Sequence, residues 1–319
     1  MREHLTRLQS LVALVLMAAA LSVATDRFLT VDNGVNVLRQ ISVNLCLSIG
    51  MTMIIIAGGI DLSVGSVLAL SGAVAAGLLK SGIALTPLGV ALQFTTLGAV
   101  VAGIAVGAAL GSFNGLVITR FALPPFVATL GMLSIARGLT MLWTGGHPIT
   151  SLGDEFAFLG TGWRLGVPMP VWIAGALAVL FTVVTRRTRF GRHLYAVGGN
   201  ERAAALSGLN VARIKVAVYT LGGALAGVAG LLSAARLNSA TPNAGVGYEL
   251  DSIAAVVIGG TSLSGGRGSI VGTVLGCLII GVLNNGLVLL EVSPFWRDVV
   301  KGFVILAAVA IDRASQRED

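Results

Sequence analysis

Two glycine-rich stretches hold the residues whose types and spacing come nearest to chemistry: AGGIDLSVGS at 57–66 and IGGTSLSGGRGS at 258–269. The second comes closest to a phosphate-binding loop, which requires Gly-x-x-x-x-Gly-Lys-Ser/Thr so that backbone amides cradle the phosphates and a lysine reaches them. Gly266 stands where that lysine would be, and apolar runs flank the stretch in place of a strand and a helix. The sequence therefore predicts that this chain does not hydrolyse ATP.

Other catalytic arrangements are not apparent in the sequence either. It contains no Gly-x-Ser-x-Gly nucleophile elbow, and no pair of carboxylates in an apolar run offers acid–base chemistry. The three histidines have no metal-ligand spacing, and Cys46 and Cys277 both lie inside apolar runs. We expect no catalytic residue, no metal site and no cofactor in this chain, with buried thiols and no disulfide.

The elements that must position the two glycine-rich stretches are strongly apolar. Hydrophobic residues make up 55% of the 319 residues, the mean hydropathy is +0.91, and 11% are charged, against about 25% in ordinary soluble domains. Nearly uncharged runs, several of them close to the ~20 residues that cross a bilayer, lie at 11–25, 44–57, 67–79, 88–111, 125–144, 171–185, 216–235, 270–290 and 299–311. We predict an all-α polytopic membrane protein of about ten transmembrane helices, with 8 to 11 allowed by the ambiguous stretch 250–290.

The basic residues predict the orientation of these spans. With ten spans and both termini on one side, most lysines and arginines fall in the loops of that side, above all in 186–215. The opposite loops hold only Arg27, Arg39, Lys80, Arg164 and Arg297. The positive-inside rule therefore places both termini and the 186–215 loop in the cytoplasm. The net charge of +7 does not indicate nucleic acid, because the basic residues do not cluster with aromatic ones.

Two local features concern the first run and the helix faces. The first run follows a basic start and ends in small residues, as a secretory signal does, but with so many later spans we expect a retained first helix. Glycines recur every four residues at Gly103, Gly107, Gly111 and Gly115, at Gly223 and Gly227, and at Gly272 and Gly276. Such small faces favour close helix packing in lipid, with the lining of a pore as the alternative.

The two glycine-rich stretches are alike: each follows an apolar run with Gly-Gly and hydroxylated residues and precedes another apolar run. They predict either broken helices in corresponding parts of two halves, which would mark a translocation path, or two tight cytoplasmic turns. Asp61 is the one carboxylate deep in the first stretch, and a charge at mid-bilayer costs on the order of 3 kcal/mol, so it should face protein, water or a cation.

Amides in or beside the apolar runs, Asn44, Asn114, Asn284 and Asn285, suit bonds between helices or bonds to a polyhydroxylated solute. The candidate residues for a translocation path are Asn44, Asp61, Ser63, Asn284 and Asn285.

The segment 186–215 is too patterned for a simple connector. After Gly198-Gly199, the residues Asn200 to Leu206 predict a short helix with Asn200 as its cap, Glu201 in its first turn and Gly208 at its end. The segment is either a solvated basic loop at the lipid surface or a docking helix for a cytoplasmic partner.

Four stretches in chain order resemble the membrane permease subunits of bacterial ribose-type ABC sugar importers, in the branched-chain amino acid/ribose permease superfamily. They are AGGIDLSVGS, GRHLYAVGGNERAAALSGLNVARIK, YELDSIAAVVIGGTSLSGGRGSIVGT and NNGLVLLEVS, and the likeness spans residues 30–312. The resemblance implies the ABC importer permease fold, with one permease domain over 1–319 that contains the cytoplasmic coupling loop 186–215. It also implies a homodimer in the lipid of the inner membrane, a cytoplasmic ATPase subunit with duplicated nucleotide domains that binds ATP and Mg²⁺, and a periplasmic sugar-binding protein.

The resemblance carries roles to individual positions. It makes Gly199, Asn200, Glu201, Ala204, Ser207 and Gly208 the coupling helix that sits in a cleft of the ATPase. It places Asp61, Ser63 and Gly65 in the permease signature, and the outer loop 237–250 with Glu249 and Asp251 near the binding protein. The stretch Leu263–Arg267 is similar to the ATP-gripping signature of ABC ATPases, but the apolar runs around it predict a glycine turn and a candidate hinge.

The expected function is ATP-driven import of a monosaccharide across the inner membrane, without enzymatic activity in this chain. Ribose is the first expectation, followed by xylose, allose, galactose and furanose sugars. The alternative is an ion-coupled secondary transporter without an ATPase, in which Asp61 would be the ion site. A structural membrane scaffold is a third possibility, which would require that changes at Glu201 and Gly208 leave transport unchanged.

Overall fold

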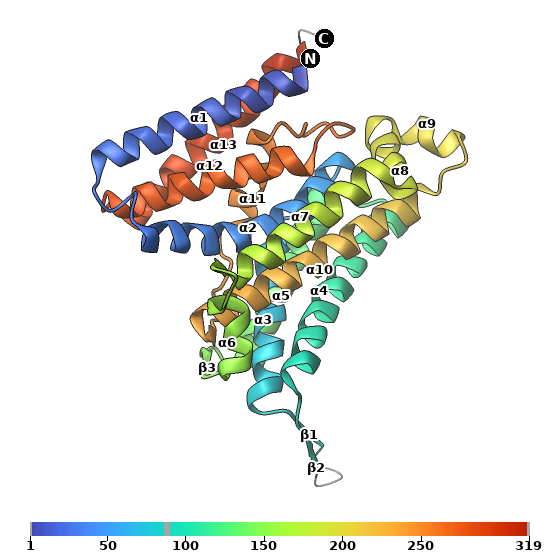
Figure 1. Cartoon of the computed structure of the whole chain (residues 1–319). Coiled ribbons are helices and arrows are strands. Elements are labelled where there is room, and N and C mark those ends of the chain that lie inside the picture. Colours follow the sequence, from blue (N-terminus) through green and yellow to red (C-terminus); the bar gives the residue numbers. More distant parts are fainter. Residues whose placement is uncertain (1, 86–89, 318–319) are drawn as a thin grey trace. The chain divides into compact units, whose positions relative to one another are not determined.

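The computed structural model describes residues 2–85 and 90–317, and it is almost wholly helical (Figure 1). The helices are α1 (Arg2–Ala24), α2 (Val31–Ile56), α3 (Val64–Lys80), α4 (Thr96–Arg120), α5 (Pro125–Thr144), α6 (Asp154–Thr161), α7 (Met169–Arg187), α8 (Arg189–Gly199), α9 (Glu201–Leu206), α10 (Val211–Leu237), α11 (Tyr248–Ile258), α12 (Ile270–Leu289) and α13 (Pro294–Arg317). Short strands form three antiparallel pairs: β1 (Ile83–Leu85) with β2 (Val90–Leu92), β3 (Ile149–Thr150) with β6 (Ser239–Ala240), and β4 (Trp163–Arg164) with β5 (Val167–Pro168).

The apolar runs of the sequence correspond to helices. Among the described residues, six helices are long and apolar enough to cross a membrane: α2, α4, α5, α7, α10 and α12. Two shorter apolar helices, Leu11–Ala24 within α1 and α3, accompany them. The structure therefore confirms a nearly all-α protein with several candidate spans, while the count of about ten and the cytoplasmic side of the termini stay predictions.

Three boundaries differ from the sequence expectation. Within the run 88–111 a strand precedes the helix: β2 pairs with β1, and α4 begins only at Thr96, because the Thr95 hydroxyl accepts the amide of Gly98 at 3.2 Å. Arg39 lies within α2 and not in a loop, because that helix begins early, at Val31. Arg297 likewise lies in the first turn of α13, so the loops assigned to the outer side are shorter than expected.

The chain forms two compact units. The first comprises Met1–Gly59, Ala174–Leu209 and Leu250–Asp319, and the second comprises Ile60–Ile173 and Asn210–Glu249. In the second unit α10 packs along α4 and α3, and α3 also packs against α5 (Figure 1). The Trp143 indole of α5 donates to the carbonyl of Ala73 in α3 at 3.0 Å, which ties these two helices by a directed bond.

The glycine faces pack as the sequence predicts. A Cβ added to Gly107 of α4 would overlap the carbonyl oxygen of Gly223 in α10, and one added to Gly223 would overlap that of Gly107. In the first unit, a Cβ at Gly276 of α12 would overlap the carbonyl oxygen of Ala255 in α11. Backbones at this separation leave no room for any side chain, which confirms close packing as the role of these glycines.

In the first unit α2 is buried along its second half and packs against α12, and α1 packs along α12 (Figure 1). Hydroxyl pairs cross these interfaces: Ser48 with Ser252 of α11 at 3.1 Å, and Thr52 with Thr273 of α12 at 2.6 Å. Cys46 and Cys277 are buried free thiols, as predicted.

Candidate functional site

Within the segment 186–215, the two short helices α8 and α9 are joined by a single residue, Asn200. The side-chain Oδ1 of Asn200 accepts a hydrogen bond from the backbone amide of Ala203 at 2.9 Å and so caps α9. The backbone amide of Asn200 donates to the carbonyl of Ala196, in the last turn of α8, at 3.1 Å. Gly208, with φ of +84°, ends the segment, and the Ser207 hydroxyl donates to Ala203 O at 2.9 Å. The predicted bounds of the short helix are confirmed.

The surface of α9 is mostly open. Ala204 is 5% exposed and forms the buried side of the helix, whereas Glu201, Arg202 and Ser207 are exposed. Leu206 is 83% exposed, which is unusual for a leucine on a capped helix with a buried side. The exposed surface of α9 therefore combines charges of both signs with an apolar side chain.

Sequence reasoning missed α8, which precedes α9. Gly198-Gly199 precede the short helix as expected, and the structure adds that they are the last two residues of α8. Thr188 caps α8 by accepting the amide of Gly191 at 3.3 Å, and Leu194 and Val197 are buried along one side. The spacing of these two apolar residues was the available signal.

The two glycine-rich stretches end helices in the same way. Gly58 follows α2 with φ of +80°, and Gly260 follows α11 with φ of +83°. In each stretch, two successive amides donate back to carbonyls two and three residues before the cap, which is the Schellman arrangement. Each stretch follows the end of a helix, which fits both alternatives, and the turn at Leu263–Arg267 lies between α11 and α12 as expected. A position of the breaks inside the membrane stays a prediction.

Asp61 faces protein within the second unit. Asp61 is 2% exposed. Its Oδ1 accepts hydrogen bonds from the backbone amide of Ser63 at 2.8 Å and from the Ser63 hydroxyl at 2.6 Å. The Asn114 amide of α4 donates to the same hydroxyl at 3.1 Å. The three side chains order the turn before α3, and a role of Asp61 and Ser63 in a translocation path stays a prediction.

The other amides differ in what they contact. Asn285 and Asn33 form a reciprocal pair between α12 and α2, with bonds of 2.7 and 3.0 Å, so that Asn285 bonds helix to helix. The Oδ1 of Asn44 is buried and has no hydrogen-bond partner in the described part of the chain. Asn284 donates to Asp251 at 3.2 Å.

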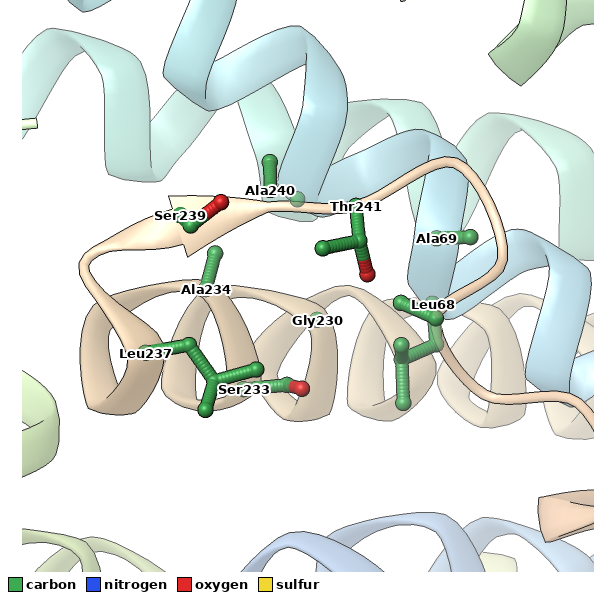
Figure 2. A pocket seen from close by; sticks show the side chains of 11 residues that line it. Leu68, Ala69, Gly230, Ser233, Ala234, Leu237, Ser239, Ala240 and Thr241 are labelled. Carbon is green, nitrogen blue, oxygen red and sulfur yellow. The ribbon is translucent and has the colours of Figure 1, made fainter. Parts of the chain in front are cut away.

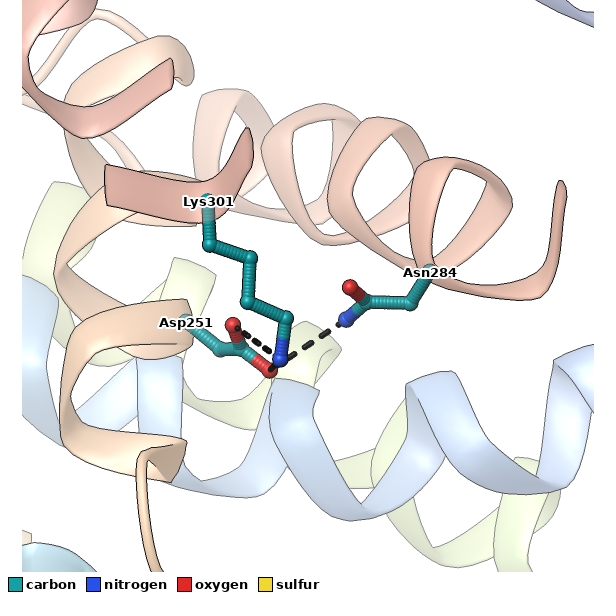
Figure 3. A network of polar contacts seen from close by, with 3 residues as sticks. All are labelled: Asp251, Asn284 and Lys301. Atoms are coloured by element: carbon teal, nitrogen blue, oxygen red, sulfur yellow. Dashed lines mark hydrogen bonds and ion pairs between the residues drawn. The ribbon is translucent and has the colours of Figure 1, made fainter. Parts of the chain in front are cut away.

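Asp251 forms an ion pair with Lys301 inside the first unit. Figure 3 shows its carboxylate between Asn284 of α12 and Lys301 of α13, with the Lys301 Nζ at 3.1 Å from Oδ1 and at 3.1 Å from Oδ2. Asp251 itself is 6% exposed. Its assignment to the binding-protein surface stays a prediction, and the structure adds a role in fixing α11 to its neighbours.

The loop 237–250 meets Gly65, at the start of α3, within the second unit. A Cβ on Gly65 would overlap the carbonyl oxygen of Gly245 and would lie 2.6 Å from Oε2 of Glu249. Arg137 of α5 donates from Nη1 to the carbonyls of Pro242 at 2.6 Å and Ala244 at 2.9 Å. Two expected site residues, Gly65 and Glu249, are therefore neighbours, and Arg137 holds the loop that carries one of them.

The second unit holds a pocket of about 520 Å³ that is lined only by Leu, Val, Ala and Trp residues of α3, α4 and α5. Figure 2 shows a small pocket of the second unit between α3, the end of α10 and the segment 239–244. Its lining residues are Leu68, Ala69, Gly72, Gly230, Ser233, Ala234, Leu237, Ser239, Ala240, Thr241 and Ala244, none of them charged. The described part of the chain also holds no group of three His, Cys, Asp or Glu side chains that could bind a metal.

Known proteins are similar to this chain over nearly its whole length. The family described as "Branched-chain amino acid transport system / permease component" matches residues 33–309. The ribose import permease protein RbsC of Escherichia coli strain K12 is 48% identical over 312 residues, covering 97% of this chain and 94% of that protein. RbsC of Bacillus subtilis strain 168 is 48% identical over 309 residues, covering 96% and 92%.

A third relative, the D-allose transport system permease protein AlsC of Escherichia coli strain K12, is 40% identical over 292 residues, covering 92% of this chain and 86% of that protein. These relatives and the apolar helices make the chain a multi-pass protein of the bacterial inner membrane and a transport component in place of an enzyme. The chain belongs to the permease-component family of ABC transporters that includes these sugar permeases.

Proposed function

We propose that this chain is the membrane subunit through which an ATP-driven importer moves ribose across the inner membrane. The observation that carries the proposal is the 48% identity to ribose import permeases of two different bacteria, over nearly the full length of both chains. The allose relative is less similar, at 40%, which is why ribose is preferred to allose, galactose, xylose or furanose sugars.

In the proposed mechanism this chain forms a homodimer surrounded by lipid and does mechanical work. A cytoplasmic ATPase subunit with duplicated nucleotide domains holds ATP and Mg²⁺ and receives α9 in a cleft. When the ATPase closes on ATP, it draws the α9 helices of the dimer together and opens the permease toward a docked periplasmic sugar-binding protein. Hydrolysis then resets the dimer.

The coupling helix supports this mechanism physically. A six-residue helix in water is marginal by itself, yet α9 has a side-chain cap, a glycine end and a buried Ala204. Those features keep the helix formed while Glu201 and Leu206 remain exposed for a partner. The ion-coupled alternative loses support, because the Asp61 carboxylate is already engaged by Ser63 and buried.

The proposal is tested by uptake of labelled ribose in cells that lack their own ribose importer. We expect uptake only when this chain is expressed together with its ATPase and its binding protein, and we expect excess unlabelled ribose to suppress the signal more than allose or galactose does. Equal or stronger suppression by another sugar would reassign the substrate. Uptake with this chain as the only added protein would overturn the ATP-driven mechanism.

A further inference from the structure

We infer that the glycine turn 262–268 transmits movement of α8 and α9 to the membrane helices, with Tyr195 and Gly198 as positioning residues. The inference rests on the proposed function, since it concerns how docking of an ATPase at α9 becomes movement of the permease. All the contacts that carry it lie within the first compact unit.

The first observation is that the turn is bonded to two different helices. The amide of Gly266 donates to the carbonyl of Ile56, the last residue of α2, at 2.9 Å. The hydroxyl of Tyr195, in α8, donates to the carbonyl of Gly268 at 2.8 Å. A carbonyl in the last turn of a helix has no partner within that helix, so the turn supplies a bond that α2 cannot make itself.

The second observation is that α8 touches both the turn and α2 through backbone. A Cβ on Gly198 would overlap the Ile56 carbonyl oxygen and would lie 2.7 Å from the Gly266 amide nitrogen. A Cβ on Gly266 would lie 2.7 Å from the Cα of Gly199. Three backbone segments therefore meet without intervening side chains, so a shift of one must displace the others.

The third observation is that the path from the partner surface to this contact is short and stiff. Asn200 alone separates α8 from α9, and its backbone bonds into both helices, through Ala196 O at 3.1 Å and Ala204 N at 2.9 Å. The turn is closed by its own bond from the amide of Ser262 to the carbonyl of Arg267 at 3.0 Å. No flexible linker lies between α9 and the turn.

The far side of the turn leads to the membrane helices. The turn connects α11 directly to α12, and the close contact of Gly276 with Ala255 holds those two helices together. A displacement of α9 thus reaches the end of α2 and the α11–α12 pair at the same point. The glycines of the turn therefore transmit displacement between helices, in addition to allowing the backbone conformation of the turn.

The test compares transport with ATP hydrolysis in the reconstituted complex of permease, ATPase and ribose-binding protein. Tyr195→Phe removes only the hydroxyl that reaches Gly268, and we expect it to lower ribose moved per ATP hydrolysed about five-fold, the factor that corresponds to one ordinary hydrogen bond. Binding of the ATPase to the permease is expected to stay at the wild-type level, because the surface of α9 is unchanged. Gly198→Ala is expected to lower the same ratio further by forcing α8 away from Ile56.

Two matched controls separate this role from a general loss of stability. Thr182→Val removes one hydroxyl bond, to Ala178 O within α7, and Gly175→Ala adds a methyl group to α7 where no atom lies within 4 Å. Both are expected to keep the wild-type ratio. If the Gly198→Ala permease does not assemble with the ATPase, the ratio measured for Tyr195→Phe alone tests the inference. An unchanged ratio in Tyr195→Phe with an active wild type would overturn the inference alone, whereas a wild type without ATP-dependent uptake would overturn the proposed function as well.

Discussion

Replacing Gly107 by valine is expected to leave little correctly folded permease in the membrane, whereas Gly131→Val is expected to be tolerated. Both glycines lie inside apolar helices, α4 and α5. A side chain at Gly107 would overlap the Gly223 carbonyl of α10, which is backbone and cannot rotate away, while no atom lies within 4 Å of a Cβ at Gly131. Forcing a packed interface apart costs about 1–3 kcal/mol, and the larger figure is a substantial part of a typical folding free energy.

The measurement is the fraction of each variant that elutes as a single species after extraction in mild detergent, together with its melting temperature. The alanine variants grade the effect: Gly107→Ala should already melt below the wild type, and Gly131→Ala should melt at or above it, since alanine favours a helix. Equal behaviour of the two valine variants would contradict the close packing of α4 on α10.

Replacing Asp251 by asparagine is expected to destabilise the first unit strongly, by about 3 kcal/mol, because it leaves Lys301 without its counter-ion in a mostly buried site. The Lys301 side chain is 25% exposed and that of Asp251 is 8% exposed, so water replaces little of the lost interaction. The asparagine retains an oxygen for the bond from Asn284, which confines the change to the ion pair.

A double-mutant cycle isolates this pair. We expect Asp251→Asn combined with Lys301→Met to melt closer to the wild type than Asp251→Asn alone, since a buried pair replaced by uncharged groups is often neutral in stability. Asp26→Asn, at an exposed acid between α1 and α2, should leave the melting temperature unchanged. Losses that simply add in the double variant would mean that the two charges do not depend on each other.

Local signals in the sequence predicted most elements correctly. The apolar runs located the long helices, because burial in lipid or protein requires them to be uncharged along their length. The bounds of α9 followed from Asn200 and Gly208, whose side chain and backbone conformation act within a few residues. The bond from Ser63 to Asp61 is equally local, and the two-residue spacing is typical of an Asx turn.

Features that depend on tertiary contact could not be predicted in this way. Gly198 lies in the last turn of α8, where its missing side chain admits the carbonyl of Ile56, a residue distant in sequence. The carboxylate that pairs with Lys301 belongs to Asp251, fifty residues earlier in the chain. Nothing in the neighbourhood of either residue specifies these contacts, because they exist only once the helices have packed.

The central claim is that this chain moves ribose only when an ATPase acts on it, and proteoliposomes of purified components test that claim most directly. With the ATPase and ATP inside the vesicles and the ribose-binding protein with labelled ribose outside, we predict ribose accumulation that stops when ATP, the ATPase or the binding protein is omitted. Accumulation by this chain alone, driven by a proton or sodium gradient, would contradict the account.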